Sequence, residues 1–164
     1  DHTWTQVVES IKKKFDVLRA RGAYVKAGVM GDANRNDGET LTNAQLASIH
    51  EFGLGNVPAR PWIRPPFVAK REEYLTILRR AYERALKSDN LHELDRVLGL
   101  LGAKMKADIQ NYVTQGNSPL QALTPETIAR RKHGGTRPLI DSSQMVDSVT
   151  FQVVSGKPSG GGGH

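Results

Sequence analysis

The sequence predicts an α+β fold, in which a small antiparallel sheet packs with a long antiparallel helical hairpin and shorter helices. Two long segments, residues 67–87 and 91–114, carry apolar side chains at three- and four-residue steps, the spacing of helices that bury one face. Two short segments, residues 23–30 and 148–154, are instead rich in β-branched and aromatic residues. Only a few residues separate the long segments, so we expect them to fold back on each other.

The N-terminal region is predicted to form an amphipathic helix over residues 5–20 that ends at Gly22. We expect its lysines to face away from an apolar stripe, which consists of Trp4, Val7, Val8, Ile11, Phe15 and Leu18. The strand over residues 23–30 comes next, and the turn-forming residues 31–38 close it.

A second, shorter helix is predicted to begin with Thr42 or Asn43 as its cap and to end at Gly53. Four prolines follow within residues 57–67. Because proline fixes φ and disfavours helix in the residue before it, we expect this segment to be extended or irregular. In the second helix of the hairpin, Gly99 and Gly102 each cost about 1 kcal/mol relative to Ala, so another backbone is expected to approach them closely.

The C-terminal third is predicted to hold a short helix over residues 124–132, a further turn of helix capped by Asp141 or Ser142, and the strand over residues 148–154. We expect residues 1–154 to form a single domain and residues 155–164 to form a flexible glycine-rich tail. An isolated pair of strands is marginal in water. Further strands are therefore expected, from residues 32–42, from chain beyond this C-terminus, or from neighbouring subunits.

Composition excludes several classes of function. The chain has 164 residues and no cysteine, which excludes disulfides, thiolate metal sites and cysteine nucleophiles. It has no apolar run of about eighteen residues, so we expect a soluble protein without a membrane partner. The net charge of +6 permits contact with nucleic acid or with an acidic protein, although most of these charges are expected only to solvate helix faces.

Motifs of catalysis and metal binding are incomplete. His50 and Glu51 begin the pattern of zinc hydrolases, but the second histidine would have to stand at position 54, which is Leu. The serine-nucleophile turn and the phosphate-binding glycine loop are missing as well. We therefore expect no enzyme, no catalytic residue, no cofactor and no metal. His50 is predicted to be a partly buried helix residue with a hydrogen-bonded imidazole, and Glu51 to lie on the surface.

Two segments of the chain resemble the signatures of a phage protein family. Residues 47–53 read Ala-x-x-His-Glu-Phe-Gly at the end of a helix, and residues 59–65 continue as Ala-Arg-Pro-Trp-Ile-Arg-Pro. Residues 123–132 and 137–141 form a second fragment, which contains Leu-Thr-Pro-Glu-Thr and Arg-Pro-Leu-Ile-Asp. In order and separation these fragments resemble the virion morphogenesis or tail-completion proteins of tailed bacteriophages, the Mu-like and related tail components.

The resemblance implies a structural virion protein of the neck or tail-proximal region. Such a protein would act in tail completion and head–tail joining as a homo-oligomeric ring, with a hexamer as the default expectation. Its partners would be copies of itself and neighbouring neck and tail proteins, such as the tail terminator, the head-closure protein or the tail tube. Contact with DNA in the channel stays open. The protein would reside in the virion, and in the host cytoplasm during assembly.

The proline-rich segment has two interpretations. Its apolar residues are expected first to anchor the segment on the core, while its arginines face outward. An arginine and a tryptophan on a stiff loop are also typical of binding hot spots. The basic cluster near residue 131 complements a helix C-terminus or makes an electrostatic contact. We expect the subunit or ring interface to include His50, Glu51, Phe52, Arg60, Trp62, Ile63, Arg64, Phe67, Arg130, Arg131 and Lys132.

Three alternative functions remain at this point. A tail terminator or head-closure protein is the nearest, because such proteins share small α+β folds and ring assembly. A basic DNA-binding protein would use the positive charge for phosphate contacts, with an affinity that falls steeply with salt. A small nuclease or other hydrolase would use His50 and Glu51, but the spacing of metal ligands is lacking.

Overall fold

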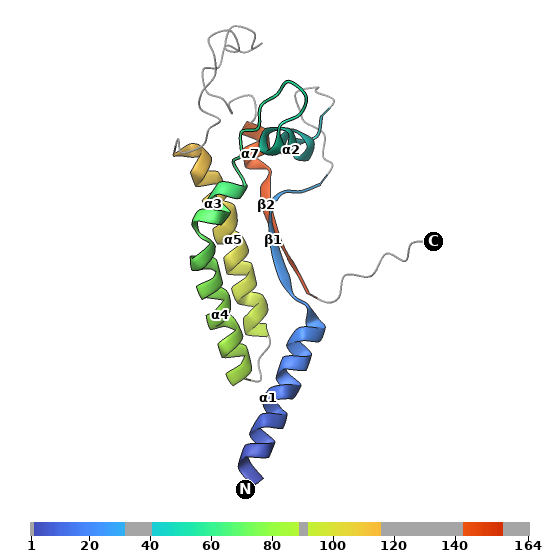
Figure 1. The fold of residues 1–164 in the computed structure, drawn as a ribbon, viewed down its shortest axis with the longest axis vertical. Helices are drawn as coiled ribbons and strands as arrows, with labels where there is room; N and C mark the ends of the chain where they lie inside the picture. The colour runs from blue at the N-terminus through green and yellow to red at the C-terminus, as the bar shows by residue number, and fades with distance from the viewer. Residues whose placement is uncertain (1, 32–40, 89–91, 116–142, 156–164) are drawn as a thin grey trace, which may run out of the picture. The chain divides into compact units, whose positions relative to one another are not determined.

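A computed structural model describes residues 2–31, 41–88, 92–115 and 143–155 of the chain. The fold is α+β, mostly helical with a two-stranded antiparallel sheet, as the sequence predicts (Figure 1). The elements, in chain order, are α1 (His2–Arg21), β1 (Tyr24–Val29), α2 (Asn43–Phe52), α3 (Arg64–Ala69), α4 (Arg71–Lys87), α5 (His92–Thr114), α7 (Ser143–Asp147) and β2 (Val149–Val154).

The described residues divide between two compact units. The first unit contains α1, nearly all of α4 and the first half of α5, and the second contains α2, α3, α7 and the rest of α5. Both strands contribute residues to each unit. The expectation that residues 1–154 fold as a single domain stays a prediction.

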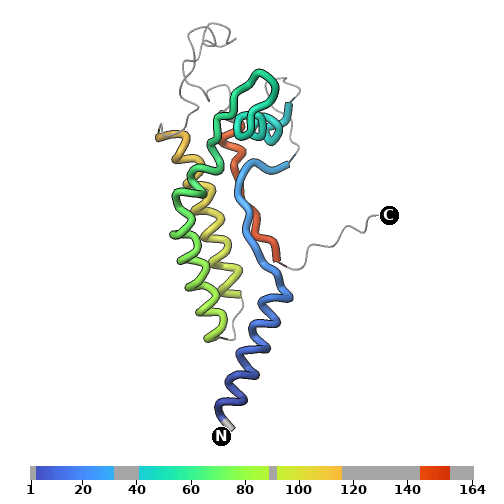
Figure 2. Tube along the Cα trace, viewed as in Figure 1, coloured from blue at the N-terminus to red at the C-terminus, as the bar shows by residue number. Residues whose placement is uncertain are grey.

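The first unit is built on the predicted helical hairpin. Helices α4 and α5 follow each other along the chain and lie side by side (Figure 2). Their shared core consists of Ala81, Ala85, Leu94, Val97 and Leu98, and α1 adds Leu18 to it. Helix α1 is also held by polar contacts, since Lys14 Nζ donates a hydrogen bond to the carbonyl oxygen of Leu86 at 3.0 Å and Arg21 pairs with Asp95. The prediction that the lysines of α1 face away from the rest of the protein is therefore wrong for Lys14, which contacts α4.

The strands begin with the alternation expected of a sheet with one buried face. In β1, Val25 is partly buried between the exposed Tyr24 and Lys26, whereas the last three residues, Ala27 to Val29, are all buried or partly buried. Both strands lie within their predicted ranges. The described part of the chain contains two strands, and residues 32–40, one expected source of a third, lie outside it.

The region of the prolines differs from its prediction. Helix α3 begins at Arg64, with Pro65 and Pro66 in its first turn. Proline is tolerated there because the first amide groups of a helix have no intrahelical acceptor. The extended prediction is therefore correct only up to Ile63, and the helix predicted from residue 67 is two helices that break at Lys70.

The glycines of α5 were expected to allow a close backbone contact. A Cβ atom added to Gly99 would meet nothing within 4 Å beyond the nearby backbone of α5 itself, so that expectation is wrong at this position. Helix α5 itself begins at His92 and ends at Thr114, close to its predicted bounds.

Helix α2 organises the second unit. Of the two predicted caps, Thr42 and Asn43, Thr42 is the one that caps it: the Thr42 hydroxyl accepts a hydrogen bond from the Gln45 amide at 3.2 Å, and the Gln45 side chain accepts one from the Thr42 amide at 2.9 Å. The helix packs against α7, which was predicted as a turn or two of helix. The predicted helix over residues 124–132 and the flexible tail over residues 155–164 lie largely outside the described residues.

None of the described helices combines the length and the apolar character that crossing a bilayer requires.

Candidate functional site

The predicted interface is organised around a buried carboxylate at the end of α2. Glu51 is only 3% exposed, so its expected position on the surface is wrong. Its Oε2 accepts hydrogen bonds from the backbone nitrogens of Trp62 at 2.8 Å and Ile63 at 2.9 Å. Its Oε1 accepts from the backbone nitrogen of Arg64 at 3.1 Å and from Arg64 Nε at 2.7 Å. The last turn of α2 thus caps the start of α3.

These contacts decide the charge of Glu51. Burial on its own would raise the pKa of the carboxyl, because it removes water from the charged form. The hydrogen bonds from the backbone of Ile63 and Trp62, and from both the side chain and the backbone of Arg64, outweigh burial and hold the pKa below its ordinary value of 4.5. Glu51 is therefore ionised at neutral pH.

Backbone contacts brace the chain between these two helices. The Arg60 amide donates to the carbonyl oxygen of His50 at 2.7 Å, and Leu54 and Val57 form an antiparallel bridge. Gly53 stands at the crossing with φ of 75°, and a Cβ atom there would lie 2.9 Å from both the Ala59 nitrogen and the Val57 oxygen. Residues 50–64, which we call the connector, are thus fixed by their own hydrogen bonds.

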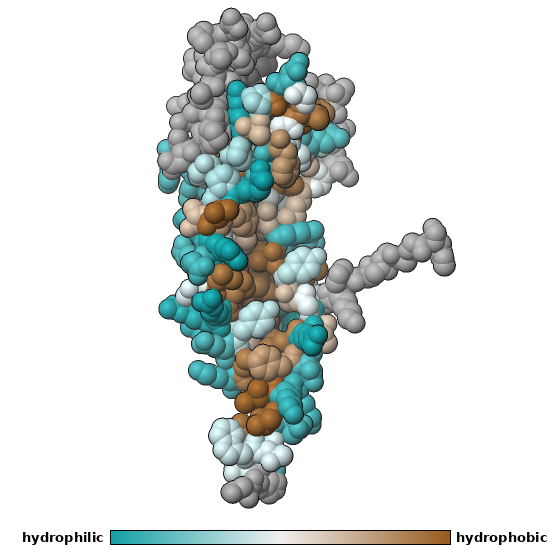
Figure 3. Space-filling model, in the orientation of Figure 1, coloured by the Kyte–Doolittle hydropathy of each residue, from teal (hydrophilic) through white to brown (hydrophobic). Residues whose placement is uncertain are grey.

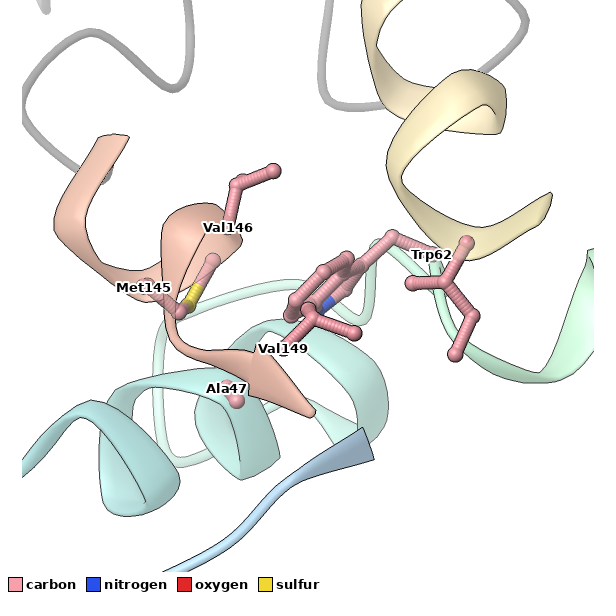
Figure 4. Close-up of a cluster of buried hydrophobic side chains, with 6 residues drawn as sticks. Ala47, Trp62, Met145, Val146 and Val149 are labelled. Atoms are coloured by element: carbon pink, nitrogen blue, oxygen red, sulfur yellow. The ribbon is translucent and has the colours of Figure 1, made fainter. Parts of the chain in front are cut away.

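Trp62 anchors the connector in the core of the second unit. Its side chain is fully buried and lies among Ala47, Met145 and Val149 (Figure 4). Ile63 and Phe67 pack at the edge of the same cluster. The prediction that the apolar residues of this segment anchor it on the core is confirmed.

The outer side of the connector is apolar and exposed. Phe52 is 65% exposed, Leu54 67% and Val68, on α3, 75%. The guanidinium carbon of Arg64 lies 4.8 Å from the centre of the Phe52 ring, and the same arginine lines a shallow pocket with Pro61, Pro65, Val68 and Ala69. We call Phe52, Leu54, Val57, Arg64 and Val68 the connector surface.

The structure brings most of the predicted interface residues together in the second unit. They are His50, Glu51, Phe52, Arg60, Trp62, Ile63, Arg64 and Phe67. Glu51 and Trp62 face inward, so any effect they have on an interface acts through the shape of the connector. Arg130, Arg131 and Lys132 lie outside the described residues.

Sequence reasoning missed three members of the connector surface, Leu54, Val57 and Val68. All three are apolar and exposed. A usable signal was present for Leu54 and Val57, because apolar residues within a turn have no helical or strand periodicity that would place them in a core.

A second buried carboxylate was also missed. Asp108, on α5, is 7% exposed and accepts hydrogen bonds from Lys70 Nζ at 2.9 Å and Lys104 Nζ at 3.2 Å. Its partner Lys104 stands four residues earlier, a spacing that brings two side chains together on a helix. Asp108 holds Lys70, the residue between α3 and α4, against α5.

The chemistry of this arrangement is that of binding. The Glu51 carboxylate is bonded to Arg64 and to backbone amides of the connector, and the outer side of the connector offers apolar groups beside the Arg64 guanidinium. Within residues 2–31, 41–88, 92–115 and 143–155, no three His, Asp or Glu side chains are grouped so that they could hold a metal ion.

Comparisons with family models, with curated proteins and with solved structures found no match. The resemblance to the phage family therefore stays a prediction from the two sequence fragments.

Proposed function

We propose that this chain is a structural protein of the neck or tail-proximal region of a tailed bacteriophage, which completes the tail and joins it to the head as a homo-oligomeric ring. The first support is the resemblance of residues 47–65 and 123–141 to the two family signatures. A hexamer is the default stoichiometry, by analogy with ring proteins of this region and their closed symmetry. The ring would form within the virion and bridge two assemblies.

The observation that carries the proposal is the connector surface. Exposed apolar groups mark candidate sites of protein association, and arginine is enriched at the hot spots of such sites. Because the connector is braced by Glu51 and by its own backbone hydrogen bonds, it loses little conformational freedom when a partner binds. We expect this surface to pack against a neighbouring subunit of the ring.

Particles assembled without the protein test the proposed role. In a phage whose gene for this chain is deleted, we expect electron microscopy to show complete tails lying free beside filled heads. Overlong tails would instead assign the chain as a tail terminator, the nearest rival. Normal, joined particles would overturn the proposal.

Point variants test the connector surface itself. Phe52→Ser combined with Val68→Ser removes exposed apolar groups and should leave the fold intact while the yield of joined particles falls. Thr150→Ala, an exposed change elsewhere in the second unit, is the matched control and should not alter the yield. Trp62 is unsuitable for this test, because its loss would damage the core. A normal yield from the folded double variant would contradict a role of this surface in assembly.

A further inference from the structure

Helix α1 presents an apolar stripe that the first unit leaves largely uncovered. Trp4 is 74% exposed, Val8 43%, Ile11 43% and Phe15 54%. Figure 3 shows this apolar surface over α1, at the lower end of the view. By contrast Leu18, the last member of the stripe, is 7% exposed and belongs to the core with α4 and α5.

The spacing of the stripe is that of a helix–helix seam. Trp4, Val8, Ile11, Phe15 and Leu18 follow one another at steps of four, three, four and three residues, the a and d positions of a heptad repeat. Leu18 already fills its place against helices of the same chain. The seam thus continues beyond the contacts within this unit, and its first four members can receive another helix.

The charges beside the seam indicate which helix it would receive. With Val8 and Phe15 at a, the flanking e and g positions hold Thr5, Val7, Lys12, Lys14, Arg19 and Arg21. Lys14 and Arg21 are already engaged with α4 and α5. Lys12 and Arg19 form the remaining flank. The acidic Glu9 and Asp16 stand at b, beside this flank, and Glu9 makes an exposed ion pair with Lys12 at 3.7 Å within α1.

A second copy of α1 fits this seam poorly. Two such helices would set basic flanks against basic flanks in either orientation, and like charges at these positions oppose pairing. The connector surface of another copy is apolar too, but it carries Arg64. A lipid surface fits less well, because the polar side of α1 carries the acidic Glu9 and Asp16 among its basic residues.

We propose that residues 4–15 of α1 dock an amphipathic helix of a different protein, with apolar a and d positions and Asp or Glu at the flanking positions. The acidic flank would pair with Lys12 and Arg19 while the apolar positions cover Trp4, Val8, Ile11 and Phe15. This inference concerns the first unit alone and does not depend on the proposed function, which rests on the connector surface.

Two synthetic peptides of three heptads provide the probe for the full chain. Both carry Leu and Ile at a and d, one with Glu at e and g and the other with Lys there. We expect fluorescence anisotropy to show that the acidic peptide binds roughly tenfold tighter than the basic one, with a preference that weakens as salt is added. Ile11→Gln with Phe15→Gln should abolish binding while circular dichroism shows the helix content retained.

Charge reversal separates a seam from general attraction to a basic protein. Lys12→Glu with Arg19→Glu should reverse the preference toward the basic peptide. The control, Lys13→Glu with Lys26→Glu, makes the same change in net charge at exposed sites off the seam and should leave the preference unchanged. Equal loss of preference in both variants would overturn the proposal.

The same variants distinguish other possible occupants of the α1 seam. Self-association in sedimentation that Ile11→Gln with Phe15→Gln removes would assign the seam to a second copy and overturn the proposal. Tighter binding to vesicles of phosphatidylcholine and phosphatidylglycerol than to the acidic peptide would assign it to a membrane surface and overturn it too. If the peptides fail to bind but the deletion phage still shows free tails, this inference is rejected and the proposed function is not affected.

Discussion

The carboxylate of Glu51 lies 2.8 Å from the backbone nitrogen of Trp62, so the residue before the end of α2 directly holds the residue that fills the core of the second unit. A single buried charge therefore fixes both the start of α3 and the position of the tryptophan. The connector surface depends on the Glu51 carboxylate, because Arg64 and Val68 lie in α3 and Glu51 holds the first residue of that helix.

Glu51→Gln should destabilise the protein by about 2–4 kcal/mol. The amide keeps the shape of the side chain but loses its charge, and its NH₂ group would face amide donors that now lack an acceptor. Urea denaturation followed by circular dichroism measures the change in the free energy of unfolding.

Glu83→Gln is the matched control, because Glu83 is exposed on α4. This variant should stay within about 0.5 kcal/mol of the wild type. Equal stability of the Glu51 and Glu83 variants would mean that the four hydrogen bonds of Glu51 do not contribute to folding.

The contribution of Glu51 should depend on pH in a defined direction. Its pKa is lower in the folded chain than its ordinary value of 4.5, so the unfolded chain takes up the proton first as the pH falls. The stabilisation is complete above pH 4.5 and is lost as the pH drops below 4.5 through the folded pKa.

Unfolding of the wild type and of Glu51→Gln over a pH series measures this loss. The difference between their free energies of unfolding should be constant at neutral pH and shrink under acid conditions. Other carboxyls with lowered pKa values, such as Glu93, occur in both proteins and cancel in the difference. A gap that keeps its full size well below pH 4.5 would contradict the role assigned to the ionised carboxylate.

Two glycines should respond to alanine in opposite directions. Gly53→Ala places a methyl group 2.9 Å from the backbone atoms of Ala59 and Val57, at a φ of 75° that disfavours side chains, and should destabilise by about 3 kcal/mol. Gly99→Ala meets open space within α5 and should stabilise by about 0.5–1 kcal/mol. Thermal unfolding of the two variants measures both effects, and a destabilised Gly99→Ala would show a close contact at α5 after all.

Local patterns predicted the elements of this fold well. Helical periodicity predicted α1, α2 and α5, β-branched and aromatic composition predicted β1, and alternation predicted β2. Thr42 was one of two candidate caps. Each of these features arises from neighbours in the sequence. The connector was harder to predict. Proline indicated an irregular segment, but the start of α3 at Arg64 depends on a carboxylate thirteen residues earlier.

The candidate site shows the same limit. Sequence reasoning predicted an interface in this segment but placed Glu51 on the surface, because a glutamate in the last turn of a short helix is ordinarily solvated. Its burial follows from amide donors that only the folded connector brings together. The sequence correctly predicted that α1 is amphipathic. It did not predict which part of the apolar stripe is covered, because the helices that cover Leu18 and leave Trp4 exposed come from distant parts of the chain.

Lys14→Met should weaken the attachment of α1 to the first unit by about 1 kcal/mol, because Lys14 Nζ donates to the Leu86 carbonyl in the last turn of α4. Methionine keeps the length of the side chain and removes the charged donor. Lys13→Met, at an exposed neighbouring position, is the matched control and should change stability far less. Hydrogen exchange of the α1 amides measures the attachment directly, and equal exchange in the two variants would show that the Leu86 contact does not hold the helix.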